Sequence, residues 1–188
     1  ERARLGLTDG DMLFALVGGV HPPEGKGQFY FIEAAGRLHA QHPHAHFMCV
    51  GVGSLVPELQ SRAAALGLAQ NFHTETFSDD LVGLLQAVDV LVHPPVGTEA
   101  LGLVILEALS CGKPVIGTRL DGIPETFVDG QHGLLVPPRD VEALTRAMAE
   151  LAADPARACA MGRAARPWVE SHFSLRALGA HTVGAYRA

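Results

Sequence analysis

The sequence predicts an α/β fold: a Rossmann-like, doubly wound parallel sheet of six strands. Short apolar runs alternate with longer segments of helical spacing, and the turns between them are short and carry glycine. The runs are apolar almost throughout, as in strands that are buried on both faces of a parallel sheet. With 188 residues, 48% of them hydrophobic, the chain has the material for one domain with a substantial core.

Six apolar runs supply the predicted strands. The first, Met12 to Val17, ends at Gly18-Gly19, which marks a buried strand that stops at a turn. The others follow in order at residues 47–52, 71–74, 88–93, 114–117 and 134–136.

Helices are predicted between the strands and over the carboxyl-terminal part of the chain. Helical spacing covers residues 28–42, 57–66, 103–110 and 124–128. Ser78 is the predicted cap of a further helix, with Asp79 and Asp80 in its first turn. Later helix starts are predicted at Asp140, at Asp154-Pro155 and at Ser174.

The charge balance argues against nucleic-acid binding. The formal net charge is −6, and the 14 basic residues include only two lysines, Lys26 and Lys113. Arginines scattered through an acidic chain do not form the broad basic face that nucleic acid requires.

Cysteine usage and hydropathy predict a cytoplasmic protein without a membrane span. The three cysteines are too widely spaced for a disulfide framework or a paired metal motif: Cys49, Cys111 and Cys159. The residues after Glu1 lack the apolar segment of a signal peptide. The apolar stretch 101–109 is far shorter than the roughly 18–20 residues of a membrane helix. Because the chain begins without methionine, we expect it to be a piece of a longer protein.

In a doubly wound sheet, ligands bind at the carboxyl ends of the strands. The candidate loops are therefore 18–27, 51–54, 74–78, 93–102 and 118–124. The first combines Gly18 and Gly19 with Lys26 and precedes a helix, a combination suited to phosphate. It is not a P-loop, because no Ser or Thr follows the lysine, and a plain surface turn remains the alternative.

Two glutamates bracket the helix predicted after the fourth strand. Glu99 lies where the strand passes into the helix, and Glu107 lies eight residues further on. If both were helical, they would be about 12 Å apart along the axis. Glycosidase pairs are closer, at about 5–9.5 Å, so the spacing favours two contacts to one long ligand. The alternative is one strand-end glutamate and one solvated helix glutamate.

The run Glu99 to Pro114, EALGLVILEALSCGKP, closely resembles the signature of retaining glycosyltransferases of the GT-B fold that use nucleotide sugars. In that family two glutamates are separated by seven residues, as they are here. The resemblance covers nearly the whole chain, and its other segments are 25–28, 87–94, 121–125 and 129–138.

The resemblance implies a role for each matching residue. Glu99 would bind the hydroxyls of the donor sugar, Glu107 the ribose and Lys26 the diphosphate. The N–H groups around Leu101, Gly102 and Leu103 would stabilise the leaving diphosphate in place of a metal. Gly18 and Gly19 would lie beside the donor, and the nucleobase over loops 51–54 and 74–77.

The resemblance also implies a mechanism without metal or cofactor. Glu99 is the one candidate for a catalytic role, and no residue is a convincing covalent nucleophile. A front-face displacement is implied, in which the leaving diphosphate deprotonates the acceptor.

One position departs from the family pattern. The family usually has an arginine after the first strand, where this chain has Gly19, and the loop to Lys26 is about two residues longer. A bidentate cation is thereby lost. Either His21 or Arg119 substitutes for it, or donor binding is weakened.

The implied architecture is half of an enzyme. Residues 1–188 would form the carboxyl-terminal, donor-binding domain, and an acceptor-binding domain would precede Glu1. Residues 174–188 would form an inter-domain helix, less buried here than in the parent protein. The expected partners are the nucleotide sugar and the missing domain, and peripheral membrane contact of the parent is left open.

The main hypothesis is transfer of a hexose from a nucleoside diphosphate sugar to an unidentified acceptor, with this chain inactive by itself. The alternative is a non-catalytic nucleotide-sugar-binding or scaffolding module, weakened at Gly19. An epimerase or phosphorylase of the same fold is disfavoured by the glutamate pair.

Other motifs are better explained structurally. The histidines at 39, 42, 44 and 46 straddle Pro43, so polar turn residues are favoured over a metal site. Gly51-Val52-Gly53 follows the second strand and lacks a third glycine, which disfavours a dinucleotide fingerprint. Cys111 has no evident base beside it and is predicted to pack in the core.

Overall fold

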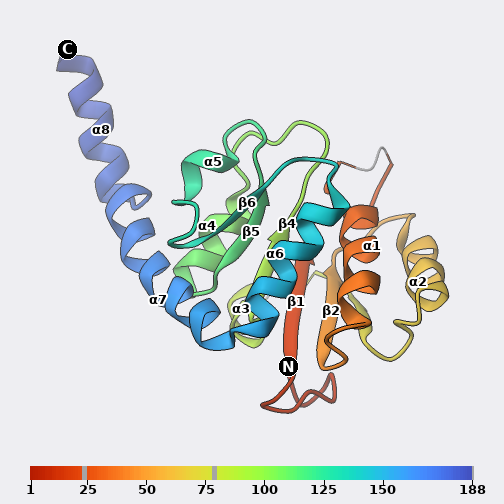
Figure 1. The fold of residues 1–188 in the computed structure, drawn as a ribbon. Coiled ribbons are helices and arrows are strands. Elements are labelled where there is room, and N and C mark those ends of the chain that lie inside the picture. The colour runs from red at the N-terminus through yellow and green to blue at the C-terminus, as the bar shows by residue number, and fades with distance from the viewer. Residues whose placement is uncertain (23–24, 78–79, 188) are drawn as a thin grey trace.

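The structure, a computed structural model, describes residues 1–22, 25–77 and 80–187. Its sheet holds six parallel strands in the order β3-β2-β1-β4-β5-β6, which confirms the predicted Rossmann-like fold (Figure 1). The strands are β1 (Met12–Val17), β2 (Ala45–Val50), β3 (Phe72–Glu75), β4 (Val90–His93), β5 (Val115–Thr118) and β6 (Gly133–Val136).

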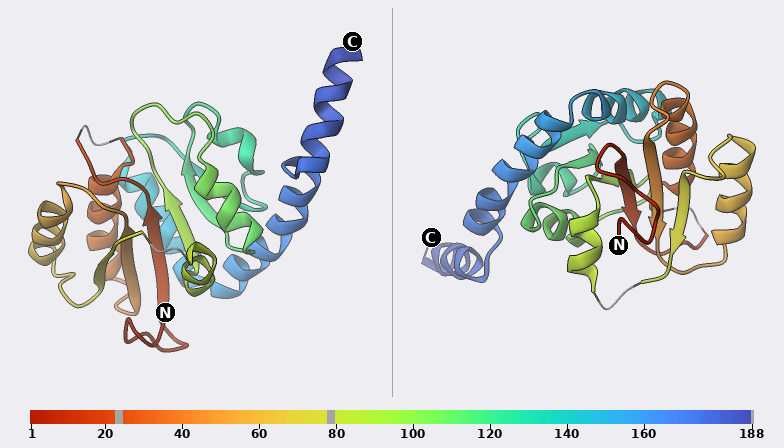
Figure 2. Two further views of the ribbon diagram at one scale, coloured as in Figure 1. Left: turned by 180° about the vertical axis from the view of Figure 1, so that it is seen from behind. Right: turned by 90° about the horizontal axis from the view of Figure 1, so that it is seen from below.

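Helices cover both faces of the sheet, and each face has its own apolar core (Figure 2). One core includes side chains of α1 (Gln28–His39), α2 (Val56–Ala65) and α6 (Val141–Ala153). The other includes those of α3 (Leu81–Ala87), α4 (Leu103–Ser110) and α5 (Ile123–Thr126). The long helix α7 (Pro155–His172) contributes to both, and α8 (Leu175–Arg187) follows it.

The central strand explains why the predicted runs are continuously apolar. In β1, Phe14 and Leu16 pack into the first core, whereas Leu13, Ala15 and Val17 pack into the second. Successive side chains of a strand point to opposite faces, so a strand covered on both sides needs an apolar residue at every position. Each fully buried Phe or Leu contributes about 1.5–3 kcal/mol of hydrophobic stabilisation.

Most elements begin or end one or two residues from the predicted positions; the second strand, for example, was predicted at 47–52 and lies at Ala45–Val50. Two differences have a clear local cause. The first helix, predicted to reach residue 42, ends at His39. Pro43 disfavours helical backbone at His42, so the chain turns before it. Asp80, predicted inside the first turn of the third helix, is instead its N-cap, and its carboxylate accepts a hydrogen bond from the Gly83 N–H. The predicted cap Ser78 and its neighbour Asp79 lie outside the described residues.

Helix α8 projects away from the rest of the chain in every view (Figures 1 and 2). It contains no buried residue, and its large apolar side chains, among them Leu175 and Tyr186, are exposed. The helix is thus little buried in this chain, whereas greater burial in the parent protein and an inter-domain role stay predictions. Among the described helices, none combines the length and the apolarity needed to cross a bilayer.

Candidate functional site

A pocket of about 360 Å³ lies at the carboxyl ends of the strands, where the strand order reverses between β1 and β4. Six of the predicted site residues line it: Gly18, Lys26, Glu99, Gly102, Leu103 and Glu107. Its remaining walls are Val17, Phe77, Leu81, His93 and Val104. Leu101 and Gly19, which were also predicted, are not among its lining residues.

Glu99 is the most highly connected polar residue of this pocket. Its Oε2 lies 3.1 Å from His93 Nε2 and forms an ion pair with Lys26 Nζ. Its backbone N–H donates to Asp121 Oδ2 at 2.9 Å. The hydrogen bonds from His93, chiefly, and from Lys26 lower the pKa of Glu99 to about 2. The carboxylate is therefore ionised and weakly basic at neutral pH, which suits binding better than proton abstraction.

Lys26 reaches Glu99 by lying across Gly18. A Cβ at position 18 would come within 3.3 Å of Lys26 Cγ, so a larger residue would displace the lysine stem. Behind Lys26, Gly27 has a φ of 76° and caps α1, and a Cβ there would lie 1.9 Å from the Pro94 carbonyl oxygen. Glycine at position 27 thus allows the β1–α1 loop to pack against the loop after β4.

The amino end of α4 forms another wall of the pocket. Gly102, with a φ of 76°, is its N-cap and has no capping side chain. The first N–H groups of the helix have no intrahelical acceptor, and Gly102, Leu103 and Val104 line the pocket. Such a helix start favours an anion. Glu107 is exposed one turn further along, whereas Glu99 precedes the helix, so the helical rise does not measure their separation.

The structure also shows what surrounds Gly19. The Gly19 carbonyl accepts a hydrogen bond from Gln28 Nε2 at 2.7 Å, which joins the loop to α1. Of the two proposed substitutes for the missing arginine, Arg119 forms an ion pair with Asp129 and His21 is exposed. Neither lines the pocket, so among its described walls Lys26 is the cation.

Sequence reasoning did not identify His93 and Asp121, which both contact Glu99. His93 is the last residue of β4, 1% exposed, and the first residue of the candidate loop 93–102. Its position at a strand end was the available signal. Asp121 lies on the loop after β5, and only the folded chain brings it to Glu99.

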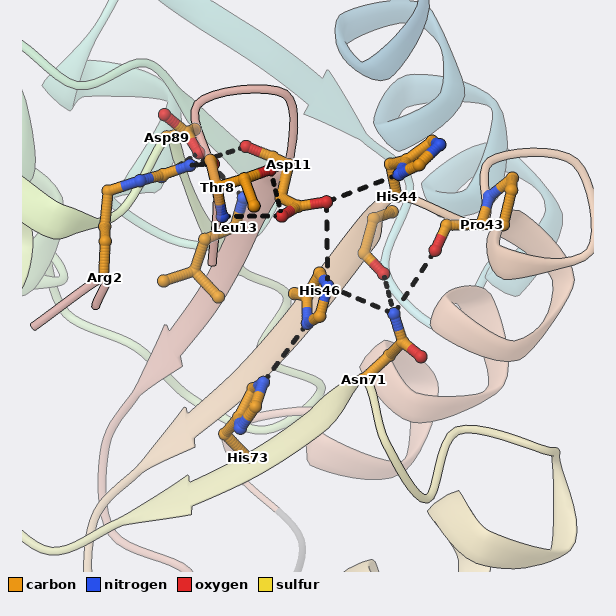
Figure 3. Close-up of polar contacts among 11 residues, drawn as sticks. Arg2, Thr8, Asp11, Leu13, Pro43, His44, His46, Asn71, His73 and Asp89 are labelled. Atoms are coloured by element: carbon orange, nitrogen blue, oxygen red, sulfur yellow. Dashed lines mark hydrogen bonds and ion pairs between the residues drawn. The ribbon is translucent and has the colours of Figure 1, made fainter. Parts of the chain in front are cut away.

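The histidine cluster lies at the opposite, amino-terminal edge of the sheet (Figure 3). His46 Nδ1 is 3.3 Å from His73 Nε2, and His44 Nδ1 is 3.4 Å from Asp11 Oδ1. Burial lowers the pKa of both His46 and His73. No group of three metal-ligating side chains occurs within the described ranges. The prediction that these histidines are polar turn residues is wrong for His46, which lies in β2 with a side chain 15% exposed, and for His39, which ends α1.

The family follows from comparison with known proteins. Residues 12–154 match the model of the glycosyl transferases group 1 family, and the chain belongs to this family. This confirms the resemblance seen in the sequence.

Curated relatives are glycosyltransferases about twice as long. The chain is 37% identical over 163 residues to a GDP-mannose-dependent alpha-(1-6)-phosphatidylinositol monomannoside mannosyltransferase of Mycolicibacterium smegmatis, covering 82% of this chain and 43% of that protein. It is 30% identical over 187 residues to an alpha-D-kanosaminyltransferase of Streptomyces kanamyceticus, covering 99% and 48%. The chain thus spans about half the length of these relatives.

Solved structures share the fold. HepE of Anabaena, solved with UDP and glucose, superimposes with a TM-score of 0.87 at 24% identity, over 99% of this chain and 50% of that one. The carboxyl-terminal domain of a group 1 glycosyl transferase, LpcC of Francisella tularensis, superimposes with a TM-score of 0.78 at 21% identity, over 93% and 94%. At these identities the similarity establishes the fold.

Proposed function

We propose that this chain is the donor-binding half of a retaining hexosyltransferase that uses a nucleoside diphosphate sugar. The observation that carries the proposal is one pocket that brings together a lysine, an uncapped helix start and two carboxylates at the switch point of the sheet. The first two groups suit a diphosphate, and the carboxylates suit the hydroxyls of sugars.

The polar groups of the pocket are proposed to bind different parts of the nucleotide sugar. The diphosphate lies between Lys26 and the amino end of α4, where both attract negative charge. Glu107 binds the ribose hydroxyls and Glu99 those of the transferred sugar. The relative from Mycolicibacterium smegmatis uses GDP-mannose, and HepE was solved with UDP and glucose, which supports a nucleotide sugar as the ligand class.

The nucleobase is proposed to lie over the loops after β2 and β3. Two apolar side chains are exposed there, Val52 and Phe77, and Phe77 lines the pocket. Gly53 lets the loop after β2 lie close to the loop after β1, because a Cβ at Gly53 would lie 1.8 Å from the Val20 carbonyl oxygen.

The proposed chemistry needs no covalent step on this chain. As the bond between sugar and diphosphate breaks, charge develops on the diphosphate, and Lys26 with the α4 N–H groups stabilises it. The departing diphosphate oxygen takes the proton of the acceptor hydroxyl, and the acceptor oxygen bonds to the anomeric carbon on the face that the diphosphate leaves. Attack on that face retains the anomeric configuration. A Glu99 pKa of about 2 supports a binding role for this carboxylate rather than that of a base.

The whole protein is proposed to include an acceptor-binding domain before Glu1 and to act in the cytoplasm, without a metal or cofactor. In this proposal α8, which buries no residue here, packs on that domain.

A thermal-shift titration of the 188-residue chain with UDP, GDP and ADP tests donor binding. We expect stabilisation by at least one of the three at millimolar concentration, and its loss in Glu107→Ala. The matched control is Glu142→Ala, which removes an exposed carboxylate on α6 that does not line the pocket. If none of the three diphosphates stabilised the chain, the donor-site proposal would be wrong.

The competing proposal is a nucleotide-sugar-binding module without catalysis. Lys26 is the one lysine or arginine among the described lining residues, and its pairing with Glu99 favours this alternative. Binding of a nucleotide sugar without turnover by the full-length protein would support it.

A further inference from the structure

His93 lines the pocket and is buried, yet its side chain has one polar contact among the described residues. Its side chain is 1% exposed, and Nε2 lies 3.1 Å from Glu99 Oε2. Because an ionised carboxylate only accepts hydrogen bonds, the contact requires the proton on Nε2. The other nitrogen, Nδ1, is buried without a hydrogen-bond partner among the described residues.

That unpartnered nitrogen bears on why a histidine stands here. If the ring only filled space, an apolar side chain of similar size would serve as well and would leave no buried polar atom without a hydrogen bond. The neighbourhood is fitted to this ring: a Cβ at Gly102 would come within 3.2 Å of His93 Nε2. The hydrogen bond to Glu99 is therefore the feature that distinguishes histidine from an apolar residue at this position.

Glu99 has a second partner of a different kind. Lys26 binds the same oxygen, Oε2, but its side chain is 37% exposed and extends from a glycine-rich loop. A diphosphate in the pocket would carry more negative charge than Glu99 and compete for the lysine. When Lys26 turns to the diphosphate, the side chain of Glu99 retains His93 as its described hydrogen-bonding partner.

We propose that His93 is a positioning residue that holds Glu99 against the pocket wall when Lys26 leaves it for the diphosphate. This inference rests on the proposed function. Diphosphate binding would thereby separate Lys26 from the Glu99 carboxylate, while the hydrogen bond from His93 would keep that carboxylate in position. The sugar would then meet a carboxylate already in place, so that less ordering remains for the binding step.

The test separates the contribution of the sugar from that of the nucleotide. Calorimetric titration of the 188-residue chain with UDP and UDP-glucose, and with GDP and GDP-mannose, gives the ratio of the two Kd values in each pair. His93→Leu and His93→Phe remove the N–H that donates the hydrogen bond to Glu99, whereas His93→Gln places an amide N–H near the position of Nε2. Melting curves establish that each variant is folded.

We expect both apolar variants to bind the diphosphates within about twofold of wild type. Their ratio of diphosphate Kd to nucleotide-sugar Kd should fall about tenfold, the usual weight of a hydrogen bond to a charged group. His93→Gln should restore the ratio to within about threefold. In a double-mutant cycle, Glu99→Gln should already remove the sugar contribution, so adding His93→Leu should cause no further loss.

An unchanged ratio in the apolar variants, an equal loss in His93→Gln, or independent losses in the cycle would each overturn the role of His93. Absence of diphosphate binding by the wild-type chain would overturn the donor-binding proposal, and this inference with it.

Discussion

The ionised Glu99 should stabilise the folded chain in a pH-dependent way, and Glu99→Gln measures how much. In the folded state its pKa is about 2, against 4.5 for an unperturbed glutamate. A folded-state pKa below the unfolded one means that the charged form favours folding. The contribution is complete above the unfolded pKa and is lost as the pH falls through the folded pKa.

The size of the effect follows from the two pKa values. The difference between the unfolded and folded pKa of Glu99 corresponds to about 3.4 kcal/mol of the free energy of unfolding at pH 7. About 1.4 kcal/mol of this contribution remains at pH 3. The free energy of unfolding of wild type relative to Glu99→Gln should therefore fall by about 2 kcal/mol from pH 6 to pH 3. Since Lys26 is 37% exposed and water screens its charge, this is an upper figure.

Urea denaturation at half-unit pH steps is the assay. The matched control is Glu107→Gln, whose carboxylate lines the same pocket without a hydrogen bond or ion pair recorded within the described residues. The difference in free energy of unfolding between wild type and Glu107→Gln should change far less from pH 6 to pH 3. In a Lys26→Met background, Glu99→Gln should still show a pH-dependent difference, because the hydrogen bond from His93, the first cause of the lowered pKa, remains. Parallel pH curves for wild type and Glu99→Gln would refute the electrostatic account of this site.

Three further predictions concern packing and exposure. Gly27→Ala should lower the free energy of unfolding by more than about 3 kcal/mol, because its Cβ would lie 1.9 Å from a carbonyl oxygen. Gly67→Ala, at nearly the same φ but with open space around it, should cost only about 1–2 kcal/mol in the same urea experiment. The exposed Cys159 should react with a thiol reagent in the native chain, whereas Cys49, whose pKa burial raises, should react only on unfolding. Amides of α8 should exchange faster than those of α6, and uniformly slow exchange across α8 would contradict its lack of burial.

The sequence alone predicted most of the secondary structure, because the signals are local. Runs such as Met12–Val17 are apolar at every position, as double-sided burial requires, and Asp154-Pro155 begins a helix where predicted. The errors fell at boundaries set by neighbouring residues, such as the end of the first helix before Pro43. The cap at Asp80 depended on which carboxylate reaches the Gly83 N–H.

The sequence by itself determined the fold class, the family and the loops in which a ligand site would form. Hydrophobic periodicity and the positions of glycines can be read directly from the sequence, and parallel strands place their carboxyl ends at one edge of the sheet. Only the tertiary structure decided what the site residues do to one another. It placed Lys26 on Glu99, put His93 behind the carboxylate and brought Asp121 to its N–H, through contacts between strands and loops distant in sequence. Such pairings depend on angstrom-scale distances and on burial, which no local pattern encodes.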